Sequence, residues 1–307
     1  MSGGRVLVTG ATGFVGKGVV PILAEAGFAV RAAVRDPAAM PEGVESAVVG
    51  DLRRPVNLTE AFRDVDYVVH SAGLAHAASG VSEEAFRESN VGITAALAAA
   101  GRKAGVKRFV LLSSIRAQTG PAAPGVISEA DKPQPTDAYG RSKLEAEQVL
   151  AEAGIPFVAL RPVLIHGPGM RFNMAALMQL ARSPWPLPLG RFTAKRSVLA
   201  RDHLADAITL ALRSETMASG PYIVADPEPL SVADMVSAFR YGWERQPGLL
   251  PVPAGIVAAA ARVSGRGAEI ERLRQPLVAD PSKLIAAGWR PRLPAMAALA
   301  ETARRHG

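Results

Sequence analysis

Short apolar runs alternate with longer amphipathic stretches through the first half of the chain. The apolar runs are nearly continuous, which predicts strands that are buried on both faces. The stretches between them repeat apolar residues at helical spacing, and a glycine follows several of them, as at a helix end. The predicted strands cover residues 5–9, 29–34, 45–49, 65–71, 108–113 and 157–161, and the predicted helices cover residues 13–26, 81–104 and 137–153.

Strands and helices in this order predict a parallel sheet covered by helices on both faces, the doubly wound α/β (Rossmann) fold. After Pro162 the pattern becomes irregular, and the proline-rich stretch 183–188 cannot continue a helix or a central strand. Helical and strand patterns return at residues 202–212 and 222–224. The last ~80 residues are rich in alanine and proline, which indicates helices and loops.

The chain is therefore predicted to have two unequal parts. We expect a Rossmann domain over residues 1–165 and a smaller, mainly helical region over residues 166–307. Part of residues 191–226 is expected to return to the Rossmann sheet. No internal repeat or low-complexity linker separates the two parts, so the second should pack directly on the first.

The composition is that of a globular protein, with 49% hydrophobic and 21% charged residues. The absence of cysteine excludes disulfides, a thiol nucleophile and a thiolate metal site, and it fits a cytoplasmic location. The longest apolar runs are far shorter than the ~20 residues of a membrane-spanning helix, so we expect no membrane association. The histidines lack the His-Glu-x-x-His spacing, and we expect no metal.

The net charge of +7 raises the question of nucleic-acid binding. The arginines are scattered along the whole chain and aromatic residues are few, which argues against a nucleic-acid surface. An anionic cofactor or a diphosphate-bearing substrate is the better explanation of the positive charge.

A glycine motif lies between the first predicted strand and helix. Gly10, Gly13 and Gly16 follow the strand at the spacing of a dinucleotide-binding turn. One glycine permits the tight turn, one lets the backbone approach a pyrophosphate, and one lets the helix pack closely on the strand. The helix N-terminus supplies free N–H groups for the phosphates. The motif therefore predicts a bound dinucleotide.

The end of the second strand bears on which nicotinamide nucleotide binds. NAD sites place an acid there for the ribose 2′-hydroxyl, whereas this chain has Arg35-Asp36-Pro37. The planar guanidinium of Arg35 matches a 2′-phosphate. Asp36 has nearly the spacing of the acid, but before a proline it can equally cap a turn. We therefore favour NADP(H) and keep NAD(H) as the alternative.

A candidate catalytic trio follows at the ends of later elements. Tyr139 and Lys143 are four residues apart at the start of a predicted helix and so share one face. Ser113 and Ser114 end the preceding strand, at the sheet edge where ligands bind. A tyrosine with a pKa of about 10 is a poor base at neutral pH unless positive charge stabilises its phenolate. A nearby lysine provides that charge, while a serine hydroxyl holds the substrate oxygen.

Together, the glycine motif, the serines and Tyr139-Gly140-Arg141-Ser142-Lys143 resemble the extended short-chain dehydrogenase/reductases over essentially the whole chain. The resemblance implies that Tyr139 is the acid/base and that Lys143 lowers its pKa and holds the nicotinamide ribose. Ser114 would orient the reacting oxygen. The predicted cofactor-binding residues are Gly10, Thr12, Gly13, Phe14, Val15, Gly16, Arg35, Asp51, Leu52, Ser71, Ala72, Gly73, Asn90, Tyr139, Lys143 and Pro162.

Beyond the cofactor-binding half, looser motifs resemble the epimerase/dehydratase-like enzymes that act on nucleotide-linked sugars. Asn173 falls where those enzymes contact the substrate diphosphate or base, and Arg196 lies in a segment like their substrate segment. His166 replaces a usual tyrosine and is expected to line the site, with a packed structural histidine as the alternative. The predicted substrate-binding residues are Ser114, His166, Asn173 and Arg196.

These features leave three functions open. The first is a nucleotide-sugar 4-epimerase or 4-keto reductase, and the second is an NADPH-dependent reductase of a non-sugar ketone or aldehyde. The third, a non-catalytic NADP-sensing protein, is disfavoured because both Tyr139 and Lys143 are present. The missing acid on the second strand, and Gln118-Thr119-Gly120 where Val-Tyr-Gly is common, weaken the epimerase version. The resemblance also implies a homodimer.

Overall fold

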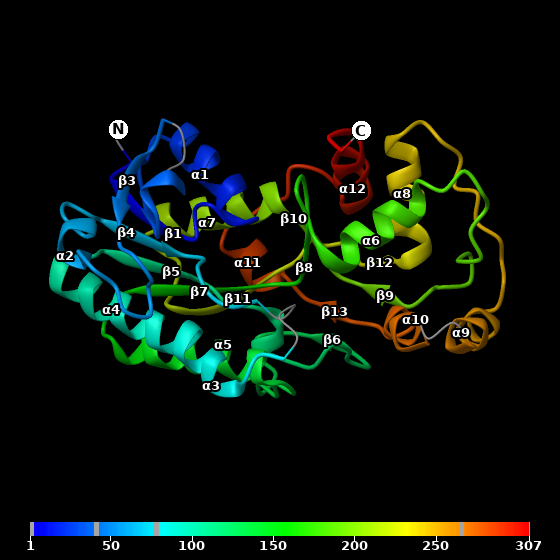
Figure 1. The fold of residues 1–307 in the computed structure, drawn as a ribbon, viewed down its shortest axis with the longest axis horizontal. Helices are drawn as coiled ribbons and strands as arrows, with labels where there is room; N and C mark the ends of the chain where they lie inside the picture. Colours follow the sequence, from blue (N-terminus) through cyan, green and yellow to red (C-terminus); the bar gives the residue numbers. More distant parts are fainter. Residues whose placement is uncertain (1–2, 40–42, 76–79, 264–266, 307) are drawn as a thin grey trace.

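The computed structural model describes residues 3–39, 43–75, 80–263 and 267–306. The chain forms two lobes (Figure 1). The larger lobe holds a sheet between helices, and the smaller lobe is mainly helical, as predicted. No helix of the described ranges is long and apolar enough to cross a membrane.

The large lobe is built on a seven-stranded sheet in which every neighbouring pair is parallel. The strand order is β11-β7-β5-β4-β1-β2-β3. The direction of strand addition reverses between β1 and β4, and open parallel sheets bind ligands at the carboxyl ends of such a pair. The strands are β1 (Arg5–Thr9), β2 (Ala29–Val34), β3 (Glu45–Val48), β4 (Tyr67–His70), β5 (Arg108–Leu112), β7 (Phe157–Pro162) and β11 (Gly220–Val224).

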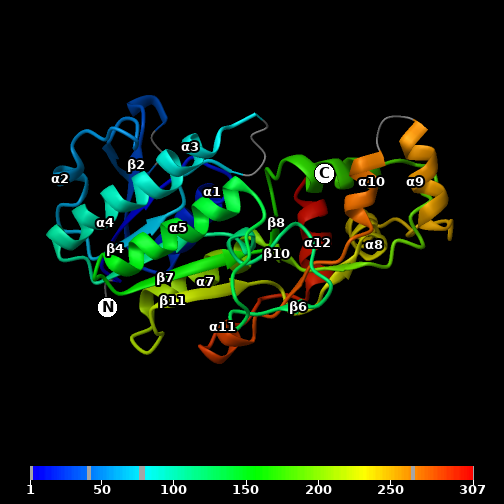
Figure 2. The same cartoon turned by 90° about the horizontal axis from the view of Figure 1, so that it is seen from below.

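Helices cover both faces of this sheet. Val6 and Val8 of β1 share one hydrophobic core with residues of α1 (Gly16–Glu25) and α7 (Arg201–Arg213). Leu7 points to the other face and joins a core with α4 (Ile93–Ala104) and α5 (Ala138–Glu152), which lie side by side across the sheet (Figure 2). This alternation along a fully buried strand explains the nearly continuous apolar runs.

The predicted helix over residues 81–104 is wrong in detail. The structure divides it into α3 (Glu83–Phe86), a π-helical turn (Arg87–Gly92) and α4. Asn90 lies within the wide turn and is buried. Similarly, α1 begins at Gly16 rather than at residue 13, because residues 13–15 belong to the glycine-rich turn. The π turn therefore buries the polar side chain of Asn90 next to the apolar face of α4.

The small lobe is assembled from segments far apart in the sequence. Its core joins α6 (Phe172–Ala181), α8 (Val232–Gly242) and α12 (Ala295–Arg304). Short strand pairs connect it to the large lobe: β8 (Leu164–His166) with β10 (Val198–Ala200), β6 (Val126–Ile127) with β13 (Val278–Ala279), and β9 (Lys195–Arg196) with β12 (Leu230–Ser231). Further helices are α2 (Leu58–Ala61), α9 (Ala254–Val263), α10 (Gly267–Leu273) and α11 (Ser282–Ala286), with 3-10 turns at Pro37–Ala39 and Ile115–Ala117.

Arg240 of α8 organises the proline-rich stretch of the small lobe. Its guanidinium is 2% exposed and donates hydrogen bonds of 2.8–3.1 Å to the carbonyl oxygens of Ala181, Ser183, Trp185, Pro247 and Gly248. Ala181 ends α6 and the other four carbonyls lie in loops, so the guanidinium supplies donors that regular secondary structure does not; Ser183 and Gly248 also accept from Arg245 and from the Leu187 amide.

We expect Arg240→Met to lower the free energy of unfolding by about 3 kcal/mol, because it leaves buried carbonyl groups without donors. Urea denaturation of this variant, compared with Arg274→Met, measures the effect. Arg274 is exposed and pairs with Glu271 three residues away, and its loss should cost less than about 0.5 kcal/mol. Equal destabilisation of the two variants would contradict the assigned role of Arg240.

Candidate active site

The glycine-rich turn connects β1 to α1 by a close backbone approach. Gly10 has φ +70°, and a Cβ there would lie 2.7 Å from the amide nitrogen of Ala72 after β4. A Cβ on Gly16 would lie 2.6 Å from Cα of Ala11. Thr12 and Gly13 are exposed at the tip of the turn. The turn therefore leaves no room for side chains inside, and its tip and the start of α1 remain accessible to a ligand.

The ends of β1 and β4 are joined by side chains behind this turn. The Thr9 hydroxyl lies 2.7 Å from Nδ1 of His70, and the Ser71 hydroxyl donates to the Thr9 carbonyl at 2.8 Å. Burial lowers the pKa of His70 to about 3, helped by the nearby Lys143 ammonium, so the imidazole is neutral. The contacts fix the start of the 71–73 segment beside the turn.

Asn90 links that segment to the helix of the predicted catalytic pair. Its Oδ1 accepts from the amide of Leu74 at 3.0 Å, and its Nδ2 donates to the Ser142 hydroxyl at 2.9 Å. Ser142 in turn donates to the Tyr139 carbonyl at 2.8 Å. A Cβ on Gly73 would lie 2.5 Å from Asn90 Oδ1 and 3.7 Å from Lys143 Nζ. The π turn thus places Asn90 between two predicted cofactor-binding segments.

Charged side chains gather where β2 and β3 end. Asp36 Oδ1 accepts from the amide of Ala38 at 2.9 Å, so this carboxylate caps a turn, the second of the two roles considered for it. Asp51 is paired with Arg53 at 2.6 Å, and this hydrogen bond, with a smaller effect of Arg35, lowers the Asp51 pKa to about 2. Arg35 is exposed. Sequence reasoning missed Arg53, which brings a second guanidinium to this edge. Leu52 lies partly buried against the sheet core.

The structure brings Ser114 and Tyr139 together. Their side chains are hydrogen-bonded, and the Ser114 hydroxyl also accepts from the amide of Arg116 at 3.1 Å. Burial raises the pKa of Tyr139 above its ordinary value of 10.0, the bond to Ser114 opposes this, and the charges of Asp137 and Arg116 add smaller opposite effects. The phenol therefore carries its proton.

Lys143 lies one helical turn after Tyr139 and is 7% exposed. Its Nζ donates to the carbonyl of Leu112 at 2.9 Å, and burial lowers its pKa to about 8, opposed by the charge of Glu147. Burial, not the charge of Lys143, has the largest effect on the pKa of Tyr139. The sequence-based expectation, in contrast, is that the lysine lowers this pKa.

A buried polar network lies next to this trio, between β5, β7 and α5. The Ser113 hydroxyl donates to Glu147, and Glu147 forms a bidentate ion pair with Arg161 at 2.6 and 3.0 Å. Arg161 also donates to Gln118, whose Nε2 donates to the Asp131 carbonyl at 2.7 Å. Glu147 and Arg161 are 7% and 3% exposed. Ser113 is thus engaged away from Ser114, and the network holds the end of β5 against α5.

Two arginines lie near the trio: the charge of Arg116 acts on Tyr139, and Arg196 neighbours Arg116. Arg116 pairs with Asp137, the N-cap of α5, whose Oδ1 also accepts from Gly140 at 2.7 Å. Arg196 donates to the carbonyls of Gln275 and Pro121 at 2.6 and 3.1 Å. Burial lowers the pKa of Arg196, and the charge of Arg116 adds to this, so the two guanidinium groups are neighbours. Sequence reasoning identified Arg196 and missed Arg116.

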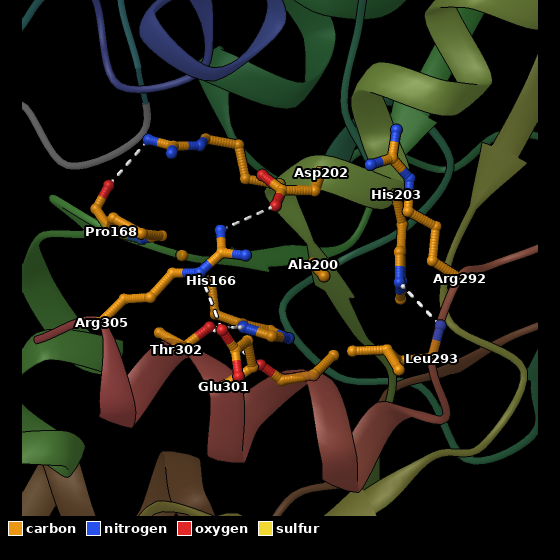
Figure 3. A pocket seen from close by; sticks show the side chains of 13 residues that line it. His166, Pro168, Ala200, Asp202, His203, Arg292, Leu293, Glu301, Thr302 and Arg305 are labelled. Carbon is orange, nitrogen blue, oxygen red and sulfur yellow. Dashed lines mark hydrogen bonds and ion pairs between the residues drawn. The ribbon is translucent and has the colours of Figure 1, made fainter. Parts of the chain in front are cut away.

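The other two predicted substrate residues, Asn173 and His166, show no contact with Ser114, Tyr139 or Lys143 among the described interactions. Asn173 is exposed near the start of α6. His166 is fully buried, with Nδ1 3.0 Å from the Thr302 hydroxyl, and burial lowers its pKa to about 3. It lines a cavity of about 110 Å³ between α7 and α12, with Asp202, Glu301 and Arg305 (Figure 3). Pro162 ends β7 and is buried.

These residues fit a nicotinamide dinucleotide. The turn offers an accessible helix N-terminus for phosphates, Arg35 and Asp51 lie at the adenosine end, and Gly73, Asn90 and Lys143 converge toward Tyr139. No group of three or more His, Asp or Glu side chains in the described ranges is arranged to hold a metal ion.

Comparisons with known proteins agree with this geometry. The NAD dependent epimerase/dehydratase family matches residues 6–225. The UDP-glucose 4-epimerase of Vibrio cholerae is 31% identical, covering 93% of this chain and 90% of its own. The 3-diazoavenalumate denitrifying reductase of a Streptomyces species is 29% identical over 94% of this chain and 97% of its own.

Among solved structures, MoeE5 in complex with UDP-glucuronic acid and NAD superposes with a TM-score of 0.77 at 26% identity, covering 99% of each chain. The UDP-N-acetylglucosamine 4-epimerase from Bacillus cereus, at 21% identity, has a TM-score of 0.76 over 98% of this chain and 99% of its own, which shows the shared fold. The chain belongs to the NAD-dependent epimerase/dehydratase enzymes of the extended short-chain dehydrogenase/reductase family.

Proposed function

We propose that the protein is an oxidoreductase that acts on a carbinol or keto carbon of a nucleotide-linked hexose, as a 4-epimerase or a 4-keto reductase. The observation that carries this proposal is the hydrogen-bonded pair of Ser114 and Tyr139, with Lys143 one turn away and a glycine-rich turn at the end of β1, two strands from β5 in the sheet. The full-length match to a UDP-glucose 4-epimerase supports the substrate class.

In this proposal each residue of the trio has one task. Ser114 donates a hydrogen bond that holds the substrate oxygen beside the phenol. Tyr139 exchanges its proton with that oxygen, while the nicotinamide, when bound, supplies or accepts a hydride at the carbon. Lys143 stabilises the phenolate by its charge and is held in place by the Leu112 carbonyl. Because burial keeps Tyr139 protonated, the structure favours its role as the proton donor in ketone reduction.

The substrate side favours an anionic ligand. The Arg116 guanidinium, which is paired with Asp137, acts on Tyr139 and neighbours that of Arg196. Asn173 has an exposed amide at the start of α6. A nucleoside diphosphate linked to a sugar satisfies both charge and hydrogen bonding there. We propose that Arg116, Arg196 and Asn173 contact the substrate, whereas the full burial of His166 supports its alternative role as a packed structural histidine.

A reductase of a non-sugar ketone or aldehyde is the second candidate. The protonated Tyr139 and Arg35 at the end of β2, where NADPH would bind, fit reduction of any ketone, whether or not it belongs to a sugar. Relatives named ceramide reductase and 2-alkyl-3-oxoalkanoate reductase, 33% and 32% identical over about two thirds and three quarters of this chain, support this version.

One experiment separates the two candidates. The protein is denatured, the released nucleotide is identified, and NADPH consumption is assayed together with interconversion of UDP-hexoses. Tightly held NAD with epimer formation and no net cofactor use selects the epimerase. NADPH oxidation that requires a keto substrate selects a reductase, and the accepted ketone then distinguishes sugar from non-sugar substrates.

We further propose that the cofactor is NADP(H), with Arg35 and Arg53 facing the 2′-phosphate. Arg35→Ser is expected to weaken NADPH binding by about tenfold and to change NADH binding by less than about twofold, because only NADPH carries the extra charge. Fluorescence titration of both nucleotides measures this preference. Arg102→Ser is the control. Arg102 is exposed in the last turn of α4, which leads into the amino end of β5, whereas Arg35 lies at the carboxyl end of β2. A uniform loss for both nucleotides would overturn the assignment of Arg35.

A further inference from the structure

Arg201, the first residue of α7, reaches the glycine-rich turn from the other half of the chain. Its Nη1 donates to the carbonyl of Phe14 at 3.3 Å and to the carbonyl of Pro168 at 2.7 Å. Its Cζ lies 5.4 Å from the centre of the Phe14 ring. One guanidinium therefore ties the turn before α1 to the segment after β8.

The close approach of Arg201 explains a glycine that the dinucleotide motif leaves unexplained. Gly18 is the third residue of α1 and is buried. A Cβ there would overlap Arg201 Nε and lie 2.7 Å from its Cδ. Glycine is unfavourable inside a helix, so its presence here serves the passage of the arginine. Gly167, in the segment after β8, also lies close to this arginine, because a Cβ there would lie 3.0 Å from Arg201 Cβ.

The contact with Phe14 has a direct consequence for ligand binding. A trans peptide unit is planar, and its C=O and N–H point in opposite directions. No cis peptide occurs in the described chain. Because the Phe14 carbonyl is directed at Arg201, the amide N–H of Val15 in the same peptide unit points away from it. Arg201 thus fixes the direction of a donor at the start of α1, where a phosphate would bind.

We propose that Arg201 is a positioning residue for the dinucleotide: it orients the Phe14–Val15 peptide toward the diphosphate and couples that turn to the 167–169 segment. The inference rests on the proposed binding of a nicotinamide dinucleotide at the turn. The positive charge of Arg201 lies next to the Phe14 carbonyl of the turn and would also attract the diphosphate.

The test uses Gly18→Ala, Arg201→Ala and the double variant, with NADH, NADPH and ADP-ribose as probes. Arg201→Ala is expected to raise the Kd of all three probes by about tenfold, because they share the diphosphate. Gly18→Ala should raise Kd in the native background, where it displaces Arg201. In the Arg201→Ala background it should change Kd by less than about twofold, because the space is then open.

Arg213→Ala is the matched control. Arg213 ends the same helix, lies 5.5 Å from the centre of the Phe28 ring and donates to the Ala26 carbonyl, so it repeats the arrangement at the other end of α1. It should leave Kd unchanged. Titrations at 10 °C, well below each variant's thermal midpoint, separate ligand binding from stability, and Arg201→Lys replaces the alanine variant if that does not fold.

Three outcomes test the positioning role of Arg201. Non-additive losses in Gly18→Ala and Arg201→Ala support the inference. Additive losses, or an unchanged Kd in Arg201→Ala, overturn it while leaving the proposed function standing. Failure of the unmodified protein to bind any of the three probes overturns the proposed function itself.

Discussion

Replacing Tyr139 by phenylalanine is expected to lower turnover by about 10³-fold while the Kd for the nicotinamide nucleotide changes by less than about twofold. The substitution removes only the hydroxyl that is hydrogen-bonded to Ser114, and it retains the ring that packs against Phe86 at a centroid distance of 5.9 Å. The α5 helix and the cofactor-binding turn should therefore be unchanged. Steady-state kinetics and nucleotide titration on the same preparation measure the two quantities.

The direction of the pH profile adds a second readout for Tyr139. Its pKa is raised above 10.0, so in ketone reduction the protonated form is present throughout the neutral range and activity should fall only on the alkaline side. Tyr241→Phe is the control, because Tyr241 is 71% exposed on α8. Turnover that survives in Tyr139→Phe would remove this residue from the proposed chemistry.

Lys143→Met is expected to produce opposite effects on activity and stability. Turnover should fall by about 10²-fold or more, because the phenolate loses its stabilising charge. The ligand-free protein, however, should become more stable at pH 7. Burial shifts the Lys143 pKa from 10.5 to about 8, and a shift of this size corresponds to about 3 kcal/mol of destabilisation by the charged form. Loss of the hydrogen bond to the Leu112 carbonyl offsets about 1 kcal/mol, which leaves a gain of about 2 kcal/mol.

The sign of this stability change depends on pH. Below pH 8 the lysine is charged in both the folded and the unfolded protein, so the full cost of its burial is present. Between pH 8 and 10.5 the unfolded protein binds more protons than the folded protein, so the stability of the unmodified protein rises with pH. The advantage of Lys143→Met should therefore be largest below pH 8 and shrink toward pH 10.5.

Urea denaturation across this pH range measures the Lys143 prediction. Lys103→Met is the control, since Lys103 is an exposed residue in the last turn of α4, and it should show no such pH dependence. A Lys143→Met protein that is less stable than the unmodified protein at pH 7 would indicate that the hydrogen bond to Leu112 outweighs the cost of burying the charge.

The sheet could be predicted from sequence because its strands other than the edge strand β3 are largely buried on both faces. Such strands appear as nearly continuous apolar runs, and the predicted ranges agree with the strands within a few residues, as for 157–161 and β7. The π turn at Arg87–Gly92 could not be predicted, because apolar residues continue at helical spacing on both sides of it. The true start of α1 was hidden for a similar reason, since Phe14 and Val15 are apolar residues of the turn.

The candidate site could be predicted only where its residues form local motifs. Tyr139 and Lys143 are one helical turn apart, so their shared face follows from spacing alone. The ion pair of Arg161 with Glu147 joins β7 to α5, and the contact of Arg201 with Phe14 joins residues 187 apart in the sequence. Arginines occur throughout the sequence, and nothing local distinguishes these two from exposed ones. Their roles depend on the topology that brings distant segments together.

The outermost strand β11 is supplied by residues 220–224, far behind its partner β7 in the chain. While the protein is being synthesised, β7 therefore remains an unpaired and strongly apolar edge until residue 224 has left the ribosome. Such an edge is a template for strand addition between chains. This interval thus exposes the nascent chain to aggregation, and chaperones that bind nascent chains would act in it.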